Sequence, residues 1–195
     1  YKRQATACRD TYLMVSMLAE KANRHVYVDK DYKKAIEAHL RAIAIREDEG
    51  LYYSLGIAMG LQGNDSASYY MDRSIELVEK KKDTTRLVHY LRNYAQLLSY
   101  ISSDYKKAAE VSKRLRSLAP DGGQVAMTDL VLTECFLKMG ELDSAQYYLD
   151  QGRALLARRE KLLSTENMMT YYQGLIDYTP VSYTHLRAHE TSAHL

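Results

Sequence analysis

The chain has 195 residues, of which 46% are hydrophobic and 27% charged, and its 27 basic and 25 acidic side chains give a formal net charge of +2. This apolar content can offset the entropy cost of ordering a chain, so the composition excludes intrinsic disorder and favours one compact domain. The near balance of charge gives no case for nucleic-acid binding, which needs a clustered basic face, and no run of 18 apolar residues is present to cross a membrane. With only two prolines and nine glycines, the chain is expected to form long helices.

The start of the chain and its two cysteines bear on the cellular compartment. Residues 1–4 contain neither an initiator Met nor the apolar stretch of a signal peptide, so we expect that the natural start is missing or that a leader has been removed. Cys8 and Cys135 lie far apart in the sequence, and Cys135 stands inside an apolar helical run. This setting favours a buried thiol over a disulfide or a metal ligand, and it leaves the compartment open.

Two internal echoes show that the sequence repeats itself. Asp31–Ala35 recurs letter for letter as Asp104–Ala108, 73 residues later, and Asp65–Asp72 matches Asp143–Asp150 at six of eight positions. One alanine near the head of each segment marks the period, with spacings of 32, 41 and 37 residues between Ala35, Ala67, Ala108 and Ala145. The pattern predicts a structural unit that repeats about every 37 residues.

Each unit has the pattern of a helix, a tight turn and a second helix. In the second unit, Tyr52, Leu55 and Met59 have helical spacing, Gly63–Asp65 forms the turn, and a second apolar stripe begins at Ala67. The fourth unit has the same order, with Gly140 at the turn. Neither helix of a pair can bury its stripe alone, so the units are expected to stack in sequence around a continuous core.

These units resemble the tetratricopeptide repeat (TPR) family, whose helix pairs carry a small residue in the first helix, Gly-Asp-Tyr at the turn and Ala at the start of the second helix. Leu55-Gly56 and Leu132-Thr133 fall where the family has its Leu-Gly pair, and Pro120 falls at its closing proline. Four units cover Thr11 to Arg159, and Met168–Gly174 looks like the first helix of a fifth. The resemblance, to divergent bacterial members, implies an all-α fold, a right-handed superhelical solenoid of antiparallel helix pairs with about four full repeats and part of a fifth.

In the family, small residues let neighbouring helices approach closely. A helical glycine costs about 0.5–1 kcal/mol relative to alanine, so Gly56 is expected where close packing gains more than this. The positions matched to the packing role are Ala35, Ala42, Gly56, Ala67, Ala95, Ala108, Ala145 and Gly152, with Asn23 at the first unit's small position. The pattern also has departures: Leu115 replaces a small residue, the second unit's turn is one residue short, the third unit carries an extra Ser, and three units lack the proline.

The last residues differ in character from the repeats. Pro180–Thr191 resembles a string found at the ends of unrelated metagenomic open reading frames, where sequencing-adapter DNA has been translated. We therefore expect a repeat domain over 1–179, a fragment open at both ends, and a non-native tail over 180–195. His185 and His189 would share a helix face beside Glu190, but a metal site needs a third ligand and a supporting second shell, so none is expected.

No catalytic or cofactor motif is evident elsewhere. Gly122-Gly123 lacks the Lys-Ser or Lys-Thr that completes a phosphate-binding loop. His25, His39 and His89 are dispersed among helices with no Cys or carboxylate at ligand spacing, which favours solvent-facing or partly packed histidines. We expect no enzyme activity, no cofactor and no metal.

The family resemblance points to a binding groove, because in TPR proteins the first helix of each unit lines the concave surface. It places ten residues on or near that groove: Tyr53, Ile57, His89, Arg92, Asn93, Gln96, Tyr100, Leu130, Glu134 and Lys138. Arg92 and Tyr53 are the expected hot spots. Chaperone-binding members hold a peptide's terminal carboxylate with a Lys and an Asn, but Glu20 and Arg24 stand at those positions, which disfavours that ligand.

The expected function is a protein-protein interaction scaffold that binds a peptide or protein partner in the groove without catalysis. Neither nucleic acid nor a membrane is an expected partner of this fragment. The alternative is the input or sensor region of a longer bacterial signalling protein, whose effector domain would lie beyond residue 179. The localisation stays open between a bacterial cytoplasm and a periplasm.

Overall fold

The computed structural model describes residues 2–119, 122–157 and 166–178. Within these ranges the regular secondary structure is entirely helical, with no β-strand, which confirms the all-helical prediction for this part of the chain. The expected non-native tail at 180–195, with His185 and His189, lies outside the described residues. The fold divides into two compact units, Tyr1–Ser103 and Asp104–Leu195, and each is described by itself.

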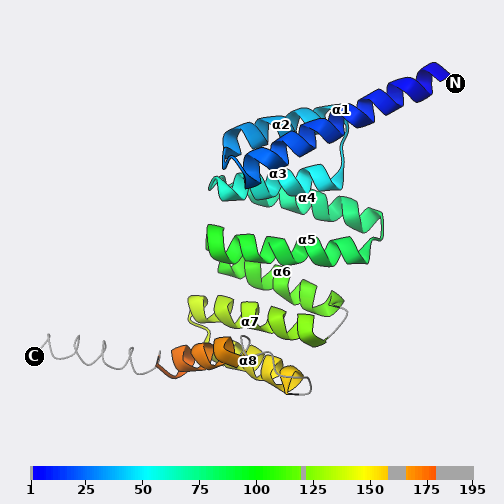
Figure 1. The fold of residues 1–195 in the computed structure, drawn as a ribbon. Helices are drawn as coiled ribbons and strands as arrows, with labels where there is room; N and C mark the ends of the chain where they lie inside the picture. The colour runs from blue at the N-terminus through cyan, green and yellow to red at the C-terminus, as the bar shows by residue number, and fades with distance from the viewer. Residues whose placement is uncertain (1, 120–121, 158–165, 179–195) are drawn as a thin grey trace, which may run out of the picture. The chain divides into compact units, whose positions relative to one another are not determined.

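The first unit contains five α-helices and a π-helix among its described residues. These are α1 (Lys2–Tyr27), α2 (Tyr32–Ile45), α3 (Glu49–Leu61), α4 (Ala67–Lys80), α5 (Thr84–Gln96) and the π-helix η1 (Leu97–Ser102), which continues α5. Each helix packs against the next along the chain, and η1 also packs against α3 (Figure 1). This is the neighbour-to-neighbour packing that the repeat pattern predicts.

The second unit contains α6 (Tyr105–Leu118), α7 (Gly122–Met139) and α8 (Leu142–Leu156), and residues 166–178 are also helical. Again α6 packs on α7 and α7 on α8. The 166–178 helix is held to α8 by a pair of amide hydrogen bonds between Gln146 and Gln173 and by Arg153 Nη1, which donates to Gln173 Oε1 at 2.7 Å. This helix covers the stretch in which the sequence shows the start of a fifth unit.

One construction recurs in the turns between helices, and it accounts for the aspartate that begins each copy of the exact sequence echo. In three turns a residue in the left-handed backbone region precedes an aspartate N-cap: Lys30 before Asp31, Lys82 before Asp83, and Ser103 before Asp104. Each aspartate Oδ1 accepts a hydrogen bond from the backbone N–H three residues later, which satisfies a free donor of the new helix. Gly140 and Glu141 stand in the same order without the side-chain bond.

All eight residues matched to the packing role are buried. At Gly56 a Cβ atom would lie 2.8 Å from Cγ and Sδ of Met71, so α4 lies directly against the backbone of α3 there. At Gly152 a Cβ atom would lie 3.1 Å from Cε of Met169. A larger side chain at Gly56 would press against the side chain and the backbone of Met71 on α4, whereas at Gly152 the flexible end of Met169 would have to move.

The extra residue of the third unit appears as the π-helix. Seven positions separate the small residue from the left-handed turn residue in three pairs, Asn23 to Lys30, Gly56 to Gly63 and Thr133 to Gly140. Between Ala95 and Ser103 the separation is eight, and η1 lies within this interval. A π-helix has a wider turn than an α-helix, so it absorbs one additional residue without breaking the helix.

Candidate binding pocket between helices α3 and α5

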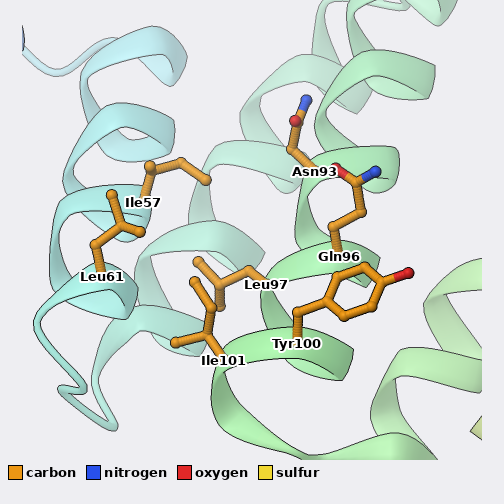
Figure 2. Close-up of a pocket in the computed structure, with 7 residues that line it drawn as sticks. All are labelled: Ile57, Leu61, Asn93, Gln96, Leu97, Tyr100 and Ile101. Carbon is orange, nitrogen blue, oxygen red and sulfur yellow. The ribbon is translucent and has the colours of Figure 1, made fainter. Parts of the chain in front are cut away.

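A pocket of about 210 Å³ opens on the first unit between α3 and the continuous α5–η1 helix. Its walls are aliphatic, and two amides and a phenol complete the lining, which comprises Ile57, Leu61, Asn93, Gln96, Leu97, Tyr100 and Ile101. Figure 2 shows Ile57 directed across from α3 and Leu97 and Ile101 directed back from η1, so the hydrocarbon side chains face the space between the helices. Leu61, Tyr100 and Ile101 are exposed to solvent, which leaves the pocket accessible from outside.

The depth of this pocket depends on a glycine in α3. Gly60 is buried, and a Cβ atom there would overlap the side chain of Leu97. Leu97 therefore rests on the backbone of α3 and forms the floor, while Ile101, one turn later, stays exposed. The pocket therefore forms where η1 approaches α3 closely at Leu97 and Gly60, while the exposed side chains around this contact leave it open to solvent.

Four of the residues that the sequence assigned to a groove line this pocket together: Ile57, Asn93, Gln96 and Tyr100. The Asn93 amide is anchored, because its Nδ2 donates to the backbone O of His89 at 2.8 Å. Gln96 is exposed and lies on the side of α5 that borders the pocket (Figure 2). Sequence analysis missed Leu61, Leu97 and Ile101, and the extra serine of the third unit is the signal that could have drawn attention to η1.

Tyr53 and His89 form an aromatic cluster on the same two helices. The Tyr53 ring stacks on Tyr90 with centroids 4.1 Å apart and lies 5.7 Å from the His89 ring. Burial is the main cause that raises the pKa of Tyr53, and likewise that of Tyr90, to about 12. Both phenols are therefore neutral near pH 7. Tyr90 is buried, so only the half-buried Tyr53 can offer a partner a hydrogen bond and ring surface, without charge.

The remaining residues predicted to line the groove lie outside the pocket and differ in their exposure to solvent. Arg92 is half-buried on α5 and does not line the pocket. Leu130, on α7 of the second unit, is only 1% exposed, so it is a core residue with no surface to offer a partner. Also on α7, Glu134 accepts a hydrogen bond from the Tyr172 hydroxyl at 3.1 Å, and Lys138 is exposed.

Two buried carboxylates are held by ion pairs. Glu49, at 1% exposure, is paired with Lys81 and Arg86. Burial alone would raise the pKa of Glu49, but the hydrogen bond from Lys81 and the two positive charges outweigh it, and the pKa is lowered. Asp129 pairs with Arg116 Nε at 2.5 Å, and there burial prevails over the pair and raises the pKa of Asp129. Both ion pairs join helices, and neither carboxylate lines the pocket between α3 and α5, which favours a structural role.

Two further buried groups, the His39 imidazole and the Cys135 thiol, are uncharged at neutral pH. Burial lowers the pKa of His39 to about 4, and neither ring nitrogen has a hydrogen-bond partner. Burial raises the pKa of the Cys135 thiol to about 12, which keeps it protonated and unreactive at neutral pH. No group of three or more His, Cys, Asp or Glu side chains is placed to hold a metal ion in the described parts of the chain.

A second hollow, of about 440 Å³, lies along α1. It is bounded mainly by exposed apolar side chains, Leu13, Met14 and Met17, with Asp10, Leu18 and Lys21 at its edges. The N-terminal part of α1 extends past α2 (Figure 1). No helix among the described residues is both long enough and apolar enough to span a membrane.

Comparison with known proteins adds no assignment: no protein-family model matches the chain, and a search of curated proteins finds no relative. The class defined by the structure is an all-helical protein in which consecutive helices pack on their neighbours.

Proposed function

We propose that the chain is a helical-repeat protein of the TPR type, a right-handed superhelical solenoid that binds a peptide segment of another protein and performs no chemistry. The observation that carries the proposal is the pocket itself. Four residues that the family resemblance assigned to a groove line one accessible apolar hollow on the first helices of two successive pairs. Such a hollow, with amides at its edge, suits a side chain and the adjoining backbone of a peptide.

The arrangement of the aromatic cluster supports the same function. Tyr53 lies one turn before Ile57 on α3, and His89 one turn before Asn93 on α5. The cluster and the pocket therefore follow one another along the same pair of helices, and together they form an elongated surface on which a peptide could bind. Tyr and Arg side chains give much contact energy in protein interfaces, so Tyr53 and Arg92 are the proposed hot spots.

The test uses peptides selected on the full chain from a phage-displayed library of random 12-residue sequences, with affinities measured by fluorescence anisotropy. Tyr53→Ala and Arg92→Ala are each expected to weaken binding at least about tenfold, equivalent to about 1.4 kcal/mol. Tyr69→Ala is the matched control, because Tyr69 is 65% exposed on α4 and lies outside the pocket. Unchanged affinity in both variants, or an equal loss in the control, would contradict the proposal.

A further inference from the structure

Helix α1 carries a second apolar row on a face that stays exposed in the described part of the first unit. The core side of this helix carries Val15, which packs with Ala42 of α2 and Leu51 of α3. An α-helix turns about 100° per residue, so the centre of the row lies roughly a third of a turn from Val15. All members of the row are exposed except the half-buried Leu18, and they are Asp10, Leu13, Met14, Met17, Leu18 and Lys21. An apolar surface with charges at its edges is typical of a binding face.

The order of these residues is symmetric about the middle of the row. Met14 and Met17 stand at equal distances from that middle, as do the two leucines, and Asp10 at one end corresponds to Lys21 at the other. If two copies of α1 lie antiparallel with their middles level, each Met14 faces Met17 of the other copy. Asp10 then faces Lys21 of the other copy at both ends, so the apolar and the charged parts of the row are complementary to themselves.

The spacing along the helix suits the same arrangement. Asp10, Met14, Met17 and Lys21 follow one another at intervals of four, three and four residues. This alternation places side chains along the seam between two helices that pack lengthwise. A parallel pair would instead set the two Asp10 carboxylates against each other and likewise the two Lys21 ammonium groups, which the charges disfavour.

We infer that α1 is a dimerisation helix, through which two copies of this chain associate antiparallel about a two-fold axis. The contact is isologous, so it closes on itself and yields a dimer rather than a longer assembly. This inference goes beyond the proposed peptide binding and does not depend on it, because the peptide pocket is lined by α3, α5 and η1. The row extends over about three helical turns, a small contact, so we expect the dimer to dissociate in the range of roughly 10–100 µM.

Sedimentation velocity of the full chain over about 5–500 µM tests the association, in reducing buffer so that Cys8 cannot link two copies. The average mass should rise toward twice that of the monomer. Met17→Glu puts a charge at the middle of the seam and should weaken association at least about tenfold. Met127→Glu is the matched control, because Met17 is 70% exposed on α1 and Met127 is 48% exposed on α7. Thermal melts check that both variants remain folded.

Exchange of the two terminal charges tests the antiparallel pairing directly. Asp10→Lys sets lysines against each other at both ends of the seam, and Lys21→Asp does the same with aspartates. Each variant alone should therefore associate at least about tenfold more weakly than the unmodified chain. An equal mixture of the two variants sets a lysine opposite an aspartate at both ends, so it should associate as the unmodified chain does. Glu110→Lys, at an exposed position of α6, is the control for the change of charge.

Three outcomes would overturn the inference. A chain that stays monomeric over the whole concentration range has no such dimer, and the exposed row of α1 then serves a different occupant. Association that Met17→Glu leaves unchanged occurs through another surface. If the unmodified chain dimerises but the mixture of Asp10→Lys and Lys21→Asp does not, the two helices are not antiparallel. None of these outcomes bears on peptide binding, which Tyr53→Ala and Arg92→Ala test separately.

Discussion

His39 shows how a single buried residue makes stability depend on pH. Its side chain is 0% exposed, both ring nitrogens lack partners, and burial lowers its pKa to about 4 from 6.5. Between these values the unfolded chain binds a proton that the native state does not, so the free energy of unfolding falls as the pH falls. The full effect of this one group is roughly 3 kcal/mol and is complete only below about pH 4.

Urea unfolding across this pH range tests the role of His39. His39→Leu, which keeps an apolar side chain of similar size, is expected to unfold with a weaker dependence on pH than the unmodified chain. His89→Gln is the matched control, since His89 is exposed, and it should leave the dependence unchanged. Equal slopes for the His39 variant and the unmodified chain would show that the imidazole is not excluded from water as the structure places it.

At the scale of the element, the backbone strain in one turn can be relieved by a substitution. Lys82 occupies the left-handed region with φ of 56°, where a side chain with a Cβ atom is disfavoured and glycine is not. Lys82→Gly should raise the free energy of unfolding by about 0.5–1 kcal/mol, because the strain it relieves exceeds the entropy that glycine adds to the unfolded chain.

Lys82→Ala is the control for this substitution. It removes the same charge and keeps the Cβ atom, so it should bring no gain. Denaturant midpoints of the two variants and the parent chain are sufficient for the comparison. If alanine stabilises as much as glycine, the gain comes from removing the lysine charge and not from the backbone.

Some features of the helices and turns could be predicted from the sequence, and others could not. The aspartate N-caps and the small packing positions could be predicted, because both are local patterns that recur with the repeat. The lysines in left-handed turns could not, since Lys30 and Lys82 stand where the pattern favours glycine. The extra serine was visible, but its conversion into a π-helix depends on Leu97 packing against Gly60 of another helix.

At the scale of the whole molecule, the contacts within the chain divide it into two compact units, Tyr1–Ser103 and Asp104–Leu195. The division falls between η1 and α6, the two helices that the repeat pattern assigns to the third pair. In a repeat protein each helix contacts chiefly its neighbours. A destabilising substitution is therefore expected to promote unfolding mainly in the helices close to the substituted residue.

Two overpacking substitutions test this expectation. Gly56→Leu in the first unit and Ala145→Leu in the second should each destabilise by roughly 1–3 kcal/mol, because both positions are fully enclosed. Hydrogen exchange should accelerate mainly in α1–α5 for the first variant and mainly in α6–α8 for the second. Lys33→Ala, at an exposed position of α2, is the control and should change neither stability nor exchange. Equal acceleration in both units for either substitution would contradict local unfolding.

The Glu49 ion pairs have a mechanical consequence for the pocket. Glu49 begins α3 and Arg86 lies in the first turn of α5, so their pairing ties these helices together at one end, and Leu97 on Gly60 ties them at the other. The gap between the two walls is thereby set before any ligand arrives. Under the proposed function, a preorganised gap of this kind would cost little entropy to fill, and its width would discriminate between side chains by size as well as by polarity.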